Sequence, residues 1–228
     1  MTSENRFKGF RKETITFLKD LKKNNNKKWF EAHKSDYQTF LLKPFRAMVE
    51  DLGQFMLLLD PYLEVAPAIN RTLSRIHKDT RFSKDKSPYK TTMWLTFKRP
   101  GKDWKDAPAF FFELSADAYR YGMGFYNASP STMSNFRDAI DEEPKNFLAA
   151  MSFFSKQHVF SIEGETYVRL FDKSKPPEIQ EWYQRKNIYF VCNKLLDSFL
   201  FSKDLIDRLI QDFSMLAPAY NYFWNIKR

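Results

Sequence analysis

The spacing of apolar residues changes near residue 70, and this change limits the folds open to the chain. Apolar side chains recur three or four positions apart in three stretches: residues 10–24, the residues that follow Asn26, and residues 45–59. That spacing predicts three amphipathic helices, with Asn26 as the N-cap of the second. From Leu73 onward apolar and polar side chains alternate instead, which is typical of a strand.

The rest of the chain mixes strands and helices. Strands are predicted at 73–79, 91–99, 109–114, 119–127 and 187–192, with a further hairpin over 158–171. Helices are predicted at 133–143, from Pro144 onward and at 203–216, the last ending before Pro218. The order predicts an α+β fold with one antiparallel-rich sheet of about four to six strands, packed against N-terminal and C-terminal helices. At 228 residues we expect a single α+β domain over 1–228, with 1–9 as a tail that need not be ordered.

Several classes of protein do not fit. Cys192 is the only cysteine, so an internal disulfide is excluded, and a reducing compartment is favoured. The polar N-terminus lacks a secretory signal, and the longest apolar run, at 55–59, is far too short to span a bilayer. No zinc-binding helix, cysteine–histidine cluster or phosphate-binding glycine loop occurs. We expect a cytoplasmic protein with no metal, no cofactor and no membrane partner.

The charge is unevenly distributed. The net charge is +9, and residues 1–100 hold 21 Lys and Arg against 11 Asp and Glu. Residues 101–228 hold 16 against 17, so the basic excess belongs to the first half. A basic excess of this kind favours an anionic partner, although it can also serve solubility alone.

The charge is densest at residues 75–90, RIHKDTRFSKDKSPYK. If the start of this segment is extended, Arg75, His77, Asp79 and Arg81 project from one face, and the aspartates can hold the arginines for an anion. Tyr89 offers a hydroxyl or a stacking face. The candidate ligand-binding residues are Arg75, Asp79, Arg81, Lys84, Asp85, Lys86, Tyr89, Lys90, Gly122 and Gly124. The competing interpretation is a solvated loop held by its own ion pairs.

Three features outside this segment are also candidates. Gly122 and Gly124 fall in a predicted strand, where glycine indicates a bulge or a close backbone approach, and a ligand beside the basic segment is the functional alternative. Glu113 follows three phenylalanines, and if it points inward it needs a cation such as Arg75 or Arg81. Residues 21–30, LKKNNNKKWF, are interpreted as a turn between helices in preference to a nucleic-acid site.

Three functions remain open. The first is an anion-binding domain in which residues 75–90 bind a phosphorylated small molecule or a nucleic-acid backbone. The second is an enzyme acting on a phosphate- or carboxylate-bearing small molecule, with Asp79 or Glu113 as the base. The third is a structural or interaction module whose charged segment only pairs with itself. The sequence does not decide whether the protein is an enzyme.

The segment 75–90 resembles the hallmark of the uncharacterised family called domain of unknown function 2461. NNNKKWFEAHKSDY, SPSTMSNFRDAI and APAYNYF agree with it. The resemblance extends roughly from Phe10 to Phe223. It implies a compact α+β domain but no activity, and it draws attention to the same charged segment.

Overall fold

A computed structural model gives the fold, and it describes residues 6–81 and 83–227. The chain forms two compact units. Unit 1 consists of Met1–Phe97, Phe111–Tyr121 and Asn193–Gln211, and unit 2 of Lys98–Phe110, Gly122–Cys192 and Asp212–Arg228. Residues of both units occur in β2 (Pro108–Leu114), β3 (Ala118–Phe125), β5 (Tyr189–Leu195) and α8 (Leu205–Lys227). The single domain expected from the sequence therefore stays a prediction.

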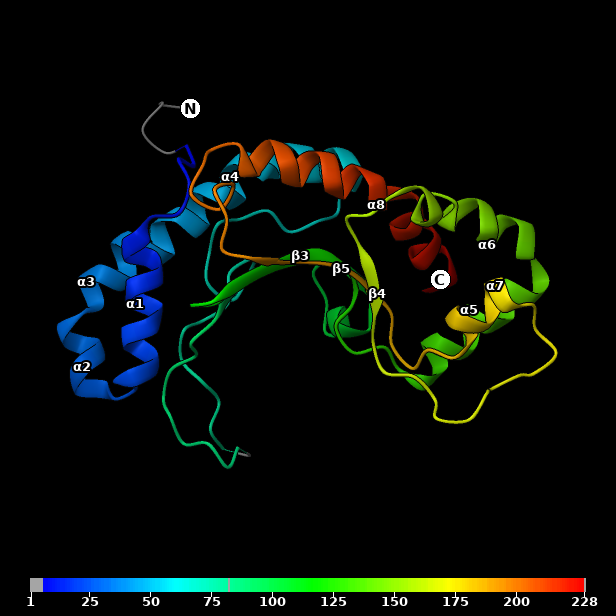
Figure 1. Cartoon of the computed structure of the whole chain (residues 1–228), viewed down its shortest axis with the longest axis horizontal. Helices are drawn as coiled ribbons and strands as arrows, with labels where there is room; N and C mark the ends of the chain where they lie inside the picture. Colours follow the sequence, from blue (N-terminus) through cyan, green and yellow to red (C-terminus); the bar gives the residue numbers. More distant parts are fainter. Residues whose placement is uncertain (1–5, 82, 228) are drawn as a thin grey trace. The chain divides into compact units, whose positions relative to one another are not determined.

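Unit 1 begins with helices that match the predicted apolar spacing. They are α1 (Lys12–Lys23), α2 (Lys27–Ala32), α3 (Lys34–Asp36), a π-helix η2 (Tyr37–Leu42) and α4 (Lys43–Leu59). Figure 1 shows α1 alongside α2 and α3. Asn26 caps α2 as predicted, because its Oδ1 accepts a hydrogen bond from the Trp29 N–H at 3.0 Å.

The N-terminal segment is fixed to this unit. Phe7 is buried, and its N–H donates to the Asp51 carboxylate at 2.9 Å. Phe10 packs between Phe45 and Phe112, with ring centroids 5.2 and 6.0 Å away. Of the tail expected over 1–9, residues 1–5 lie outside the described part of the chain.

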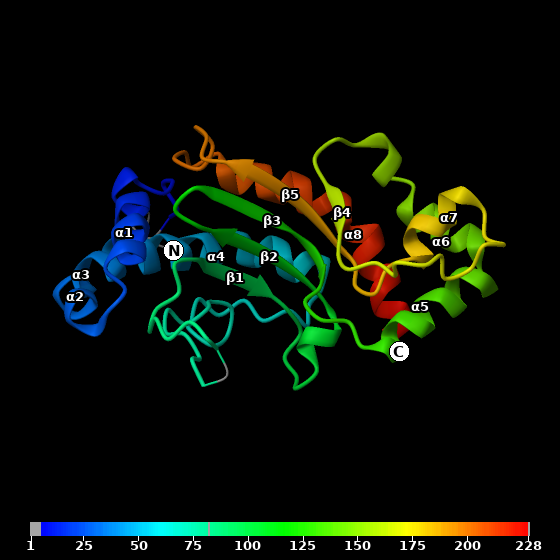
Figure 2. The ribbon, with the colours of Figure 1, turned by 60° about the horizontal axis from the view of Figure 1, so that its bottom comes forward.

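The strands form one five-stranded antiparallel sheet in the order β1-β2-β3-β5-β4, so the predicted α+β class is confirmed. The strands are β1 (Met93–Phe97), β2 (Pro108–Leu114), β3 (Ala118–Phe125), β4 (Ser161–Glu163) and β5 (Tyr189–Leu195). Figure 2 shows β1, β2 and β3 side by side. β2 and β3 form the predicted hairpin, closed by a 2.9 Å bond from the Ser115 N–H to the Ala118 carbonyl.

The strand predicted at 73–79 does not form as one element. Residues 72–74 pair with β1 through the bonds from the Ser74 N–H to the Trp94 carbonyl (2.9 Å) and from the Thr96 N–H to the Thr72 carbonyl (2.8 Å). His77 instead bridges Tyr89. The alternating pattern therefore predicted extended backbone, but the two halves of the segment pair with different partners.

Unit 2 holds the remaining short elements: a 3-10 turn η3 (Trp104–Asp106), α5 (Pro130–Glu142), α6 (Pro144–Met151), a 3-10 turn η4 (Phe154–Lys156) and α7 (Pro177–Tyr183). Ser129 caps α5, and its hydroxyl accepts a hydrogen bond from the Thr132 N–H at 3.1 Å. The hairpin predicted over 158–171 is wrong. β4 pairs with β5, and Thr166 bridges Arg185, so the short strand is stabilised by distant residues.

The C-terminal helix α8 (Leu205–Lys227) runs through Pro218, where the sequence predicted its end. Proline removes one backbone donor from a helix interior. The residues beyond it include Tyr220 and Phe223, which are 1% and 0% exposed. Burial of these rings accounts for the continued helix, because aromatic side chains bury large areas. Within the described residues, no helix has both the length and the apolar character needed to cross a bilayer.

Candidate anion-binding surface

The charged segment 75–90 folds as a loop with a short ladder at its base. The Lys78 N–H donates to the Pro88 carbonyl and the Lys90 N–H to the Ile76 carbonyl, both at 2.8 Å. These bonds flank the bridge between His77 and Tyr89. We call this segment the basic loop. Figure 1 shows it projecting away from the helices and strands of unit 1.

The base of the loop is anchored to the turn between α1 and α2. The Asn25 side-chain amide donates to the Tyr89 carbonyl at 2.9 Å and accepts from the Tyr89 N–H at 3.0 Å. The Phe30 ring stacks on the Tyr89 ring with centroids 4.1 Å apart. Tyr89 is 3% exposed, so it anchors the loop rather than offering its ring to a ligand, and burial raises the pKa of its hydroxyl.

Both aspartates of the loop bind cations of the same loop. Arg81 forms a bidentate pair with Asp79, with Nε and Nη2 at 3.0 and 2.8 Å from the two carboxylate oxygens. These hydrogen bonds lower the pKa of Asp79 from 3.8 to about 2. Asp85 accepts from Lys78 Nζ at 2.5 Å and from the Ser87 N–H at 2.9 Å, and the pKa of its carboxyl is lowered as well, chiefly by Lys78.

Four loop cations have no carboxylate partner among residues 6–81 and 83–227. Lys86 Nζ donates to the Thr80 carbonyl and Lys90 Nζ to the Arg75 carbonyl, each at 2.9 Å. Lys90 also lies over the Trp94 ring, and burial together with the charge of Arg75 lowers its pKa. Arg75 and Lys84 are exposed, and in the described structure neither side chain forms a hydrogen bond or an ion pair, although the charge of Arg75 helps to lower the pKa of Asp79. The described part of the loop therefore presents a net positive surface above an anchored base.

Glu113, Gly122 and Gly124 each contact other parts of the sheet. Glu113 pairs with Arg120 on β3, with both carboxylate oxygens 3.2 Å from the guanidinium nitrogens, so its cation is one that the sequence interpretation had not considered. A Cβ at Gly122 or Gly124 would overlap the backbone of β5 at Phe190 or Tyr189. The space that each glycine leaves is therefore filled by the neighbouring strand.

Lysines that the sequence interpretation set aside lie near the anchor. Lys27 and Lys28 are exposed and follow Asn25 by two and three positions. Since Asn25 binds the base of the loop, these lysines at the start of α2 follow the anchor closely in the chain. The four lysines of LKKNNNKKWF already indicated a basic surface in the sequence, and a turn between helices can carry such a surface.

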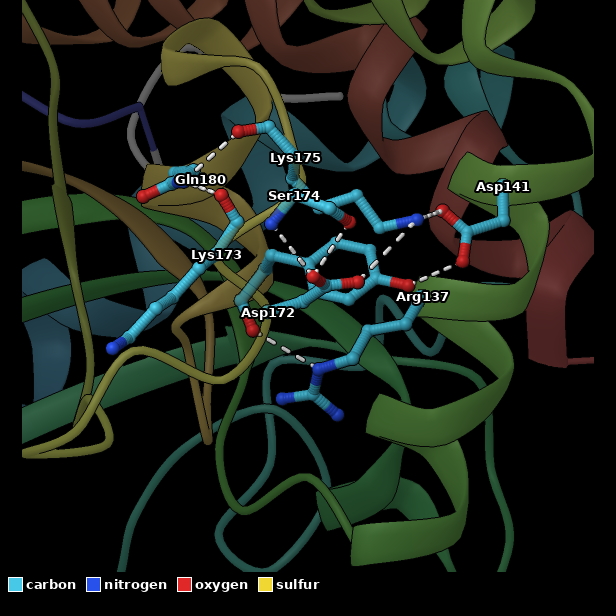
Figure 3. Close-up of polar contacts among 8 residues, drawn as sticks. Arg137, Asp141, Asp172, Lys173, Ser174, Lys175 and Gln180 are labelled. Carbon is cyan, nitrogen blue, oxygen red and sulfur yellow. Dashed lines mark hydrogen bonds and ion pairs between the residues drawn. The ribbon is translucent and has the colours of Figure 1, made fainter.

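Unit 2 contains a second polar cluster, centred on Arg137 of α5 (Figure 3). The buried Arg137 guanidinium donates to the carbonyls of Tyr183, Met133 and Arg185 at 3.0, 2.8 and 2.6 Å. Close by, Asp141 accepts from Lys175 Nζ and from the Tyr183 hydroxyl, each at 2.5 Å. These bonds of Arg137, Lys175 and Tyr183 all end on acceptors of the chain itself, so the cluster holds α5, α7 and the segment before α7 together. In the described part of the chain, no group of three His, Cys, Asp or Glu side chains is placed to hold a metal ion.

The basic loop and the sheet both lie in the part of the chain that matches a known protein family. The sequence profile of one family, described as conserved hypothetical protein (DUF2461), matches residues 13–222. The chain belongs to DUF2461. The matched range includes the whole basic loop, which confirms the resemblance. No curated protein matches the chain significantly.

Proposed function

We propose that unit 1 binds the phosphate backbone of nucleic acid through the basic loop. The observation that carries this proposal is that some charged side chains of the loop bind one another while others face solvent. Asp79 and Asp85 are engaged in fixing the loop, while Arg75 and Lys84 remain exposed without a carboxylate partner in the described structure. Exposed cations that form no ion pair can bond phosphate oxygens without first breaking a bond to a carboxylate.

The projecting form of the loop favours an extended ligand over a small molecule. Small molecules bind in concave sites, whereas a phosphate backbone can follow a protruding basic surface. Lys27 and Lys28 near the anchor would lengthen the contact. The lone buried Cys192 and the basic composition agree with a cytoplasmic location, which we propose as well.

The enzyme alternative is less well supported. A general base needs a pKa near the working pH, and the pKa of Asp79 is about 2 because Arg81 holds its charged form. Glu113 is occupied by Arg120. The third alternative, a module with a fully self-paired loop, accounts for both aspartates but leaves Arg75 and Lys84 without a role.

Fluorescence anisotropy with random-sequence oligonucleotides over a series of salt concentrations tests the proposal. Each lost phosphate contact should flatten the slope of log affinity against log salt by about 0.9 for duplex and about 0.7 for single strands. The double variant R75A/K84A should therefore lower the slope by about 1.4 to 1.8 and weaken binding to all sequences alike.

The matched control is K145A/K156A, which removes two exposed lysines of unit 2. It should leave the slope nearly unchanged. Equal slopes for wild type and R75A/K84A, or equal losses in both double variants, would show that the basic loop is not the binding surface. Binding of phosphate-bearing small molecules that R75A/K84A abolishes, without any oligonucleotide binding, would instead support the small-ligand function.

A further inference from the structure

A second basic feature of unit 1 lies away from the loop, where the N-terminal segment meets the start of α4. A hollow of about 580 Å³ opens there. Its charged lining residues are Arg6, Lys8, Arg11, Lys43, Arg46 and Glu50. Five cations and one carboxylate thus share one concave surface, which we call the N-terminal hollow.

One wall of the hollow is the segment 6–11, and its course is fixed. Phe7 and Phe10 are buried on the inner side, whereas Arg6, Lys8 and Arg11 are exposed. The backbone between them bends at Gly9, whose φ of +94° favours glycine and whose missing Cβ leaves room for the Phe201 backbone. The Phe10 N–H donates to the Leu200 carbonyl at 3.0 Å. The cations of this wall therefore stand on an ordered backbone.

The opposite wall comes from η2 and the first turn of α4. Gln38 and Thr39 of the π-helix line the hollow together with Lys43 and Arg46. A π-helical turn is less favourable than a continuous α-helix, and such turns are frequent at functional sites. Here the turn places two neutral hydrogen-bonding side chains beside two cations.

The cations of the hollow outnumber its single carboxylate, Glu50, by five to one. Among residues 6–81 and 83–227, none of the five cations has a carboxylate within ion-pair distance. Like charges gathered in a concave site repel one another, and the low-dielectric walls concentrate their field on any ligand that enters. An anion with several charges would relieve this repulsion, and arginine forks suit phosphate oxygens.

We infer that the N-terminal hollow binds a small molecule that carries several phosphate groups. The volume lies in the range of about 300–1,000 Å³ that is usual for small-molecule sites. Five cations match a chain of two or three phosphates, and Gln38 and Thr39 can bond its neutral parts. This site is separate from the basic loop and does not depend on the function proposed for it.

Isothermal titration calorimetry of the full chain with inorganic tripolyphosphate tests the inference. Wild type should bind, and K43Q/R46Q should weaken binding about 10-fold or more, since each removed cation deletes a charge-assisted hydrogen bond. R6Q/K8Q, from the other wall, should act in the same direction. The control K145Q/K156Q, which also removes two exposed lysines, and the loop variant R75A/K84A should bind as wild type does.

Lysine footprinting gives a readout that needs no variant. Acetylation of wild type with and without tripolyphosphate should show protection of Lys8 and Lys43, and unchanged labelling of Lys145 and Lys156. A nucleoside triphosphate should give the same protection if the phosphate chain is what the hollow recognises. No binding of tripolyphosphate at low salt, uniform protection of all four lysines, or a loss of affinity in R75A/K84A equal to that in K43Q/R46Q would overturn the inference.

Discussion

The side chain of Asn25 forms two hydrogen bonds with the main chain of Tyr89, which lies 64 residues further along the sequence. An amide side chain carries an N–H donor and a carbonyl acceptor side by side, so it can pair with a backbone as a neighbouring strand would. This single contact connects the turn between α1 and α2 to the base of the basic loop.

Replacing Asn25 by Ala should destabilise the protein by about 1–3 kcal/mol, because both partners on Tyr89 are part-buried and lose their bonds. Urea unfolding measures the change in the free energy of unfolding. Asn24→Ala is the matched control. Its amide bonds only the exposed Asp20 carbonyl and should cost clearly less. Equal costs in the two variants would mean that the contact to Tyr89 contributes little.

Substitutions at two glycines should change the free energy of unfolding in opposite directions. A Cβ at Gly122 would overlap the Phe190 backbone of β5, so Gly122→Ala should destabilise by about 2 kcal/mol or more. A Cβ at Gly53, inside α4, meets only the Val65 Cβ at 3.7 Å, so Gly53→Ala should stabilise by about 0.5–1 kcal/mol. Thermal and denaturant unfolding check both variants. A neutral Gly122→Ala would contradict the close approach of β3 and β5.

The carboxyl of Asp79 should titrate near pH 2 in the folded protein. Its pKa is lowered from 3.8, so its pairing with Arg81 stabilises the fold above pH 4 and is lost as the pH falls toward 2. Carbon NMR of the side-chain carboxyl measures the midpoint. Arg81→Ala should return the pKa most of the way to 3.8, whereas Arg75→Ala, which removes a weaker influence, should move it little. A midpoint near 3.8 in wild type would show that the pair does not persist in solution.

Replacing the buried Arg137 by Met should cost about 3–5 kcal/mol, because three backbone carbonyls lose a charged donor. Arg169→Ala removes an exposed arginine from the same unit and should be nearly neutral. Chemical unfolding followed by tryptophan fluorescence separates the two. A small cost for Arg137→Met would indicate that water can replace the guanidinium.

The helices of unit 1 could be predicted because their signals are local. The apolar stripe of α1 and the cap formed by Asn26 both lie within a few residues of the structure that they specify. Glu113 shows a signal that was present but unused. Counting outward from the pair Ser115 and Ala118 places Glu113 opposite Arg120, and opposite charges stabilise such cross-strand pairs.

The remaining features depend on partners far away in the sequence. Alternation at 73–79 predicted an extended chain. It could not show that residues 72–74 would pair with β1 and His77 with Tyr89. The end predicted before Pro218 failed because burial of Tyr220 and Phe223 outweighs one missing backbone bond. The N-terminal hollow joins residues 6–11 to Lys43 and Arg46, and no local pattern connects them.

The pairing of residues 72–74 with β1 also affects how copies of the protein meet. A bare outer strand is a template for β-augmentation between molecules, and natural proteins shield such borders. Here the outer side of β1 is already occupied by Thr72 and Ser74, and β4 at the other border has only three residues, Ser161–Glu163. The row of open main-chain groups at β1 is therefore covered by residues of the same chain, which limits strand pairing between copies at that border.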